Sequence, residues 1–225
     1  MGGSSSLLLG TIISFEYILS EIALHLHKND LPFDVIFSDS VAVDTEAMGL
    51  CARRDRLCLV QLCSSDGDVH LVKMEKGCYE HAENLKRLLV NDKILKIFHY
   101  ARFDVGVLNH HFGIKINYIY CTKIASRVCR TYTSRHGLKN LCKDLLGIDL
   151  SKQEQMSDWG SETLSQEQMK YAASDVLYLH KLKSKLDELL KREDRMALAQ
   201  ECFDAVKTIA TLDLIDMPLE ILFNH

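Results

Sequence analysis

Several features that would point to common protein classes are missing from this sequence. Basic residues do not exceed acidic ones, because 27 Lys and Arg stand against 31 Asp and Glu, for a net charge of -4. Proteins that coat long duplex nucleic acid usually carry a basic excess, so any nucleic-acid contact here must be local or the ligand short. The eight cysteines form no Cys-x-x-Cys pair and show no zinc-finger spacing. We interpret them as reduced, buried thiols of a cytosolic protein.

Signals for membranes and secretion are also scarce. The apolar stretch from Leu7 to Ile13 is too short to span a bilayer, and no Lys or Arg precedes it as in a secretory signal. We therefore expect a cytoplasmic protein with no membrane partner, in which residues 1–20 are an accessory extension, either native or foreign to the natural chain. Glycine-rich phosphate loops, Ser-His-Asp sets and haem signatures are absent too.

Only two prolines occur, Pro32 and Pro218, and they flank the body of the chain. No repeat or linker divides it, so we expect one domain over residues 21–225, ending in a helix and a tail. Strands are predicted at 35–37, 41–44, 57–62, 69–72 and 94–98, with a hairpin joining the second and third. Helices are predicted at 80–90, 103–111, 122–132, 137–146, 165–191 and 193–212. Early strands and late helices indicate an α/β fold, with helices packed on a mixed sheet.

Acidic residues occur at the ends of these apolar elements. Asp44 and Glu46 share one face of a strand end, where like charges repel and lose hydration. Asp104 lies in the first turn of a helix, and Tyr171 and Asp175 share a helix face at i and i+4. Each has an ordinary alternative: a helix-dipole charge, a solvated acid, a strand-end cap or a core aromatic with a surface hydroxyl. Four acids and a tyrosine together favour a functional site.

Two-metal hydrolysis of a phosphodiester needs such a set. Two divalent cations about 3.5–4 Å apart clamp the attacking and leaving oxygens, and Mg²⁺ and Mn²⁺ prefer carboxylate ligands. A cation between Asp44 and Glu46 would relieve their repulsion, and the Tyr171 hydroxyl could position the attacking water or receive its proton. The predicted catalytic residues are Asp44, Glu46, Asp104, Tyr171 and Asp175, of which the four acids bind two cations, Mg²⁺ or Mn²⁺.

Three segments in order resemble the exonuclease motifs of the DEDD superfamily, tyrosine subclass. They are DTE (44–46), FHYARFD (98–104) and YAASD (171–175). The segments KIASRVCRTYTSRHGLKNLC and LSKQEQMSDW are similar to the ribonuclease D pattern between the second and third motifs. The resemblance runs from about residue 22 to the C-terminus. It implies a ribonuclease H-like (DnaQ-like) exonuclease fold with a five-stranded mixed sheet flanked by helices.

The length of the chain indicates which members of this superfamily the sequence resembles most. Ribonuclease D carries helical nucleic-acid-binding domains after its catalytic domain, and here the sequence stops about 35 residues after the long predicted helix. The compact size and the tail LDLIDMPLEILFNH resemble the nanoRNase C family. That family degrades very short RNA, dinucleotides included, and forms an octameric ring. The resemblance implies a metal-dependent 3′-5′ exoribonuclease that converts short single-stranded RNA to nucleoside 5′-monophosphates.

Other functions stay open at this point. Ribonuclease D-like trimming of structured RNA, or 3′-5′ digestion of DNA, would use the same acids, because contacts to the 2′-hydroxyl cannot be read from sequence. A non-catalytic scaffold on the same fold would be expected to lack one of the acids, and all are present. A homo-oligomer is predicted as well, because the apolar tail 217–223 has little of its own domain to pack against.

Residues around the acids are candidates for substrate binding. In relatives, a residue at the position of Gly49 or Leu50 wedges beside the terminal base; the alternative is an apolar turn residue. Lys123 and Arg127 begin a basic stripe that is either a solvated face or a phosphate-binding edge. Trp159 is expected to plug the core. The predicted substrate-binding set is Thr45, Gly49, Leu50, His99, Arg102, Lys123, Arg127, Arg135, His136, Lys152 and Gln155, with a core role as the alternative for His99.

Overall fold

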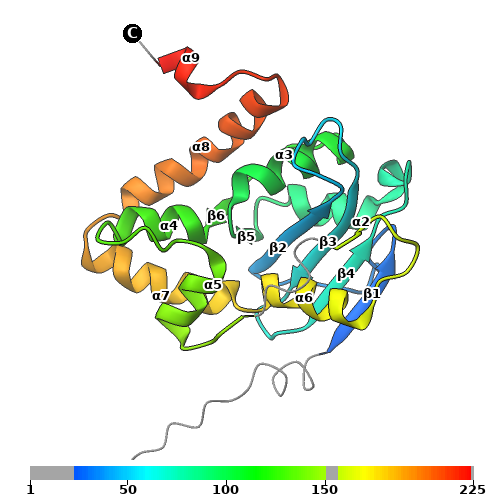
Figure 1. Ribbon diagram of the computed structural model, residues 1–225, viewed down its shortest axis with the longest axis horizontal. Helices are drawn as coiled ribbons and strands as arrows, with labels where there is room; N and C mark the ends of the chain where they lie inside the picture. Colours follow the sequence, from blue (N-terminus) through cyan, green and yellow to red (C-terminus); the bar gives the residue numbers. More distant parts are fainter. Residues whose placement is uncertain (1–22, 151–156, 224–225) are drawn as a thin grey trace, which may run out of the picture.

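A six-stranded mixed sheet forms the centre of the computed structural model, which describes residues 23–150 and 157–223 (Figure 1). The strands are β1 (Leu24–Lys28), β2 (Ser40–Ala47), β3 (Leu57–Cys63), β4 (Val69–Lys73), β5 (Leu95–Phe98) and β6 (Ile119–Cys121). They lie in the order β1-β4-β3-β2-β5-β6. The pairs β2–β3 and β3–β4 are antiparallel, as expected for the predicted hairpin, and the other pairs are parallel.

The expectation of five strands was wrong, and the errors lie mainly at the sheet edges. β1 alternates Leu and His on an exposed edge and shows no buried apolar run, while β6 has only three residues. Both exist because a neighbouring strand supplies a ladder of hydrogen bonds, which no local pattern reveals. Residues 35–37, predicted as a strand, form a loop from which Phe37 packs into the core.

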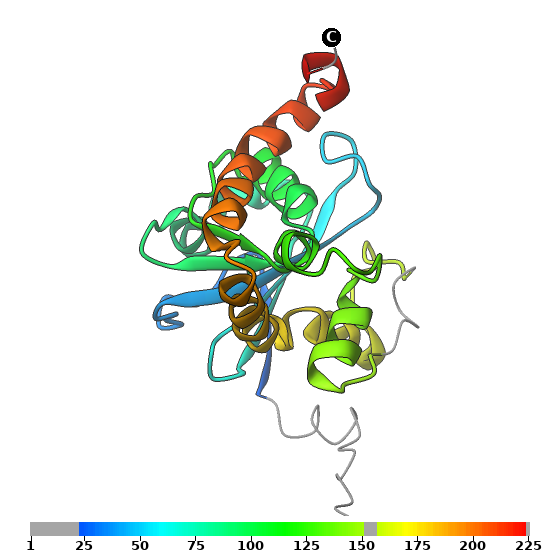
Figure 2. The ribbon, with the colours of Figure 1, turned by 90° about the vertical axis from the view of Figure 1, so that its left-hand side faces the viewer.

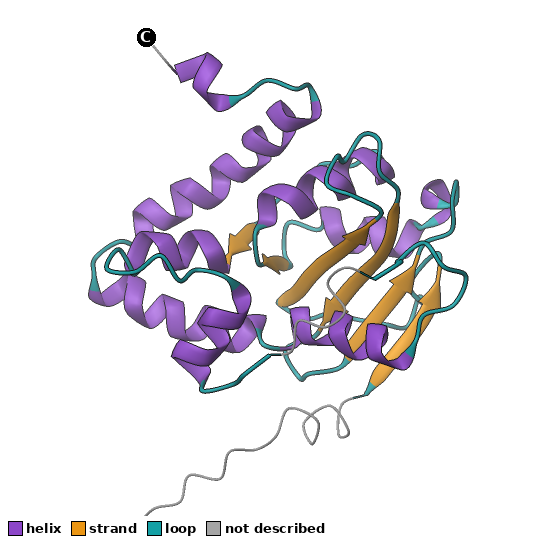
Figure 3. Ribbon diagram, in the orientation of Figure 1, coloured by secondary structure: helices purple, strands orange, loops and turns teal. Residues whose placement is uncertain are grey.

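Helices pack around the sheet (Figure 3). They are α2 (Glu83–Val90), α3 (Ala101–Phe112), α4 (Thr122–Cys129), α5 (Leu138–Leu141), α6 (Gln166–Leu177), α7 (Leu179–Arg192), α8 (Met196–Leu214) and α9 (Leu219–Phe223). A 3₁₀ turn, η1 (Tyr79–His81), precedes α2, and a π-helical segment, η2 (Cys142–Leu146), continues α5. Among the described residues, no helix combines the length and apolarity needed to cross a membrane.

The long helix predicted over 165–191 is in fact two helices. The predicted capping box is confirmed: the Ser165 hydroxyl accepts from the Gln168 amide at 3.1 Å, and the Gln168 side chain accepts from the Ser165 amide at 2.8 Å. The break falls at the buried Tyr178 (φ -100°, ψ -1°). It lets α6 lie across β2, β3 and β4 while α7 packs on α4.

The ends of three elements meet at one place because of the sheet register. β2 pairs with β5 only from Ser40 to Ala42, so the rest of β2 extends past the end of β5. The chain leaves β5 and enters α3 directly, with Tyr100 at its N-cap. α6 crosses β2 from another direction. The three motif segments therefore converge at the end of β2.

The C-terminal end of the chain extends away from the sheet. α8 packs along α3. α9 lies beyond the C-terminal end of α8 and is well separated from the rest of the domain in both views (Figures 1 and 2). The apolar side chains of α9 are exposed, at 69% for Ile221 and 73% for Phe223.

Candidate active site

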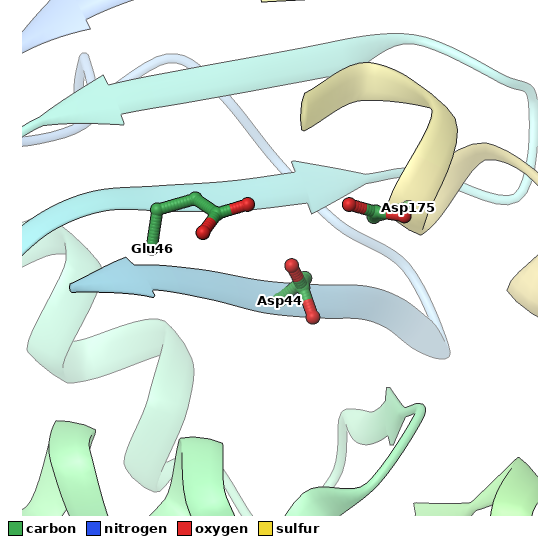
Figure 4. Close-up of side chains that lie close together, drawn as sticks. All are labelled: Asp44, Glu46 and Asp175. Atoms are coloured by element: carbon green, nitrogen blue, oxygen red, sulfur yellow. The ribbon is translucent and has the colours of Figure 1, made fainter. Parts of the chain in front are cut away.

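Three carboxylates from two elements face one small space (Figure 4). Asp44 and Glu46 come from β2, and Asp175 comes from α6. One carboxylate oxygen of each lies within 4.8 Å of the others. Strand alternation places the first two on one face, and the crossing of α6 over β2 brings the third to them.

The fourth predicted acid, Asp104, is not one of these three clustered carboxylates. It is only 3% exposed in the first turn of α3, and the Thr45 hydroxyl donates a hydrogen bond of 2.7 Å to its Oδ1. Burial, and then repulsion from the Asp44 charge, raises the pKa of Asp104, so the two carboxyl groups interact. Thr45, predicted to bind substrate, is thus buried and holds an acid in place.

The negative charges of these four carboxylates are not balanced by nearby cationic side chains in the described part of the chain. Burial raises the pKa of Asp44 to about 7. Burial, and then repulsion from the other acids, raises the pKa of Glu46 to about 10. Burial also raises the pKa values of Asp104 and Asp175 well above the ordinary range. None of the ion pairs within the described ranges involves these four acids. Oxygen donors held together without a cationic partner fit a hard divalent cation.

Tyr171 lies one helical turn before Asp175 and faces the same cluster. Burial and the nearby acids raise its pKa above the ordinary value, so the hydroxyl keeps its proton at neutral pH. Burial and repulsion from Asp44 keep the pKa of Asp175 raised, and a hydrogen bond from this hydroxyl offsets part of that rise. The ring of Trp159 lies 6.1 Å from that of Tyr171, and Trp159 is buried in the core as predicted. The tyrosine is therefore held between a core aromatic and a carboxylate.

A cavity of about 890 Å³ opens above the carboxylates. Its lining includes Asp44, Glu46, Tyr171 and Asp175. Other parts of its lining are apolar or aromatic: Met48, Leu50, Tyr100, Phe103, Leu138, Leu150 and Trp159. Sequence reasoning did not select Met48, Tyr100 or Phe103. The nearest sequence signal was the position of the two aromatics beside Asp104, but a bulky residue with a left-handed backbone, as at Tyr100 (φ 75°), is visible only in the structure.

Five residues predicted to bind substrate line the same cavity: Thr45, Gly49, Leu50, His99 and Lys123. Leu50 is 88% exposed. A Cβ at Gly49 would lie 2.2 Å from the Asp55 carboxylate, so the hairpin loop itself explains this glycine. His99 bonds to the Thr122 hydroxyl at 2.8 Å, and burial lowers its pKa to about 3, so its ring is neutral. The Lys123 ammonium lies 3.9 Å from the ring centre of Tyr100.

The rest of the predicted substrate-binding set does not line this cavity in the described structure. Arg102 pairs with Asp213 at 2.5 and 2.6 Å and lines a neighbouring hollow. Arg135 pairs with Asp144 at 2.9 Å, and His136 bonds to Ser126 at 2.9 Å. Arg127 is exposed, while Arg130, next in its stripe, is buried against Asp144 at 2.8 Å. The remaining two, Lys152 and Gln155, lie outside the described residues.

One polar residue at the site was missed by sequence reasoning. Gln61 on β3 stands directly opposite Asp44 in the β2–β3 register, and its Nε2 donates to Asp44 Oδ2 at 3.3 Å. The sequence feature that could have indicated Gln61 was its single amide side chain within the apolar strand LCLVQLC.

The fold and the site together define a ribonuclease H-like 3′-5′ exonuclease. A family model described as 3′-5′ exonuclease matches residues 12–191. The structure of Brucella melitensis NrnC bound to pGG is 47% identical, with a TM-score of 0.86 over 91% of this chain and 99% of that chain. The same protein with bound Mg²⁺ is 46% identical, with a TM-score of 0.85 over 90% and 99%. The chain belongs to the NrnC-like members of the 3′-5′ exonuclease family.

More distant relatives agree with this assignment. Ribonuclease D of Bartonella henselae is 30% identical over 175 residues, which are 78% of this chain and 40% of that protein. The chain thus spans about 40% of the length of this curated relative. Escherichia coli RNase D shares the fold, with a TM-score of 0.66 at 24% identity over 79% of this chain and 45% of that chain. The predicted family, fold class and enzyme class are therefore confirmed, apart from the strand count.

Proposed function

We propose that the chain is a metal-dependent exoribonuclease that hydrolyses very short single-stranded RNA, dinucleotides included, to nucleoside 5′-monophosphates. The observation that carries the proposal is the carboxylate cluster in a cavity of about 890 Å³ with apolar walls. That volume lies in the range of small-ligand pockets and is small for a structured RNA. The NrnC relative, whose structure was solved with pGG, supports a dinucleotide as the substrate.

We infer that Asp44, Glu46, Asp104 and Asp175 hold two divalent cations, Mg²⁺ or Mn²⁺. Support comes from the three clustered carboxylates, the unpaired charge at the site and the Mg²⁺ bound to the NrnC relative. Such cations, when bound, supply positive charge against the charge that develops on the scissile phosphate. The Thr45 hydroxyl keeps Asp104 oriented toward the cluster.

The other residues of the cavity would act on water and substrate. The protonated Tyr171 hydroxyl, paired with Asp175, can hold the attacking water in line with the phosphate. The exposed face of Leu50 offers a flat apolar surface to a nucleobase. Lys123 is a cation at the rim without a carboxylate partner among the described ion pairs, and it is placed to contact a substrate phosphate.

The proposal is tested by timed digestion of 5′-labelled RNA of two, five and twenty nucleotides, with Mg²⁺ or Mn²⁺ and an EDTA control. We expect fast loss of the dinucleotide and slower loss of the twenty-mer, with no activity in EDTA or in Asp44→Asn and Asp175→Asn. Preference for the twenty-mer, with dinucleotides accumulating, would favour trimming of the ribonuclease D type. Matched DNA oligonucleotides test the DNA alternative.

We also propose that the protein forms a homo-oligomer through its C-terminal tail, for which an octameric ring is one candidate assembly. The exposed apolar side chains of α9, which projects beyond α8, support this (Figure 2). Light scattering of the native chain and of the double variant Ile221→Asp/Phe223→Asp tests it. A monomeric mass for the native chain would contradict the proposal.

A further inference from the structure

Gln61 is an isolated polar side chain in the interior of the sheet. It lies in the middle of β3, where all seven residues are buried, and its exposure is 0%. Its Nε2 donates to Asp44 Oδ2 at 3.3 Å. Its Oε1 is buried as well, and no group of the described chain donates a hydrogen bond to it.

This arrangement lowers the stability of the folded state. A buried acceptor without a donor loses its hydration and gains nothing in return, whereas an apolar side chain of similar size would fill the same space without that cost. Leu59, two residues earlier on β3, is such a side chain and stands opposite Glu46 in the same register. Within the described part of the chain, the Gln61 side chain makes one hydrogen bond, and its acceptor is a carboxylate of the active site.

We propose that Gln61 is a positioning residue for the metal-binding carboxylate of Asp44, an inference that rests on the function proposed above. The amide N–H holds Oδ2, which fixes the rotation of the carboxylate that shares the cluster with Glu46 and Asp175. The bond is long, so it acts through orientation more than through strength. Groups that orient a metal ligand in this way typically contribute about 10–100-fold to metal affinity or activity.

The test compares Gln61→Met, which keeps the length of the side chain and removes the amide, with Leu59→Met as the matched control. For each we would measure dinucleotide hydrolysis against Mg²⁺ concentration, the KM for the dinucleotide at saturating Mg²⁺, and the melting temperature in EDTA. For Gln61→Met we expect about a 10-fold higher Mg²⁺ requirement. Its KM should be unchanged and its melting temperature equal or higher. Leu59→Met should leave the Mg²⁺ requirement unchanged.

Two results would overturn the inference. One is a Mg²⁺ requirement for Gln61→Met that matches the native enzyme. The other is a fall in its melting temperature together with a loss of activity that added Mg²⁺ does not restore, because that pattern marks a structural residue. Asp44→Asn, assayed beside them, separates this failure from failure of the proposed function. An inactive Asp44→Asn with an unaffected Gln61→Met refutes only the role of Gln61, whereas an active Asp44→Asn refutes the proposed function itself.

Discussion

Removing one charge from the carboxylate cluster should stabilise the protein when no metal is bound. In Asp44→Asn the amide keeps the shape of the side chain and removes an ionisable group that is crowded by other acids. Burial raises the pKa of Asp44 from 3.8 to about 7 in the folded chain. The folded state thus disfavours the charged form, whereas the unfolded chain ionises freely.

The size and sign of the effect follow from this pKa. A shift of one pKa unit corresponds to about 1.4 kcal/mol, so the full shift corresponds to about 4 kcal/mol. The cavity admits water, and we expect about half of this, roughly 2 kcal/mol. Because the folded pKa is raised, the stability of the metal-free native protein should fall as pH rises from about 4 to about 7 and stay low above it.

Thermal melting in EDTA at pH 8 checks this prediction. We expect Asp44→Asn to melt about 4–8 °C above the native protein. Mg²⁺ should raise the melting temperature of the native protein and have less effect on the variant, because the variant lacks one ligand. Asp144→Asn is a control of opposite sign, since hydrogen bonds from Arg130 and Arg135 lower the pKa of Asp144 and its charge is therefore favourable. If the melting temperature of Asp44→Asn in EDTA is equal to or below that of the native protein, the charge of Asp44 does not destabilise the metal-free fold, and the reasoning fails.

Three further changes test the site and the sheet edge. Tyr171→Phe should lower kcat by about 10²-fold or more while leaving the Mg²⁺ requirement unchanged, as steady-state kinetics would show. Thr45→Val removes the 2.7 Å bond to Asp104 and should cost about 10–100-fold in activity, with Thr45→Ser restoring most of it; equal activity of the two variants would contradict the role of the hydroxyl. Burial lowers the pKa of His70 to about 4, so its contribution is complete above pH 6.5 and declines in acid. Solvent screening should halve the full effect, so the free energy of unfolding in urea should fall by about 1 kcal/mol more for the native protein than for His70→Gln between pH 7 and pH 5. Equal changes in the two proteins would refute this.

Local chemistry made part of the site predictable. Asp44 and Glu46 had to share a face because side chains alternate along a strand, and Tyr171 and Asp175 had to share one because residues four apart do so on a helix. The capping box at Ser165 was visible for the same reason, since its partners lie within one helical turn. Such features depend on the spacing of neighbours, which the sequence states directly.

Long-range contacts decided which of the candidate cations face the site. Arg102 and Arg135 looked as available in the sequence as Lys123, and each instead pairs with an acid on another element: Arg102 with Asp213 and Arg135 with Asp144. Lys123 remains at the cavity because no described carboxylate reaches it. A basic stripe indicates where charges lie along a helix, but their partners come from other segments.

The sequence by itself determined the order of the acids, the hairpin, the main buried strands and the class of enzyme. The tertiary structure alone decided that Thr45 holds Asp104, that Gln61 donates to Asp44, that β1 and β6 complete the sheet, and that the helix breaks at Tyr178. The physical reason is that the first group follows from periodicity and residue chemistry along the chain. The second follows from strand register and helix crossing, which bring together residues far apart in the sequence.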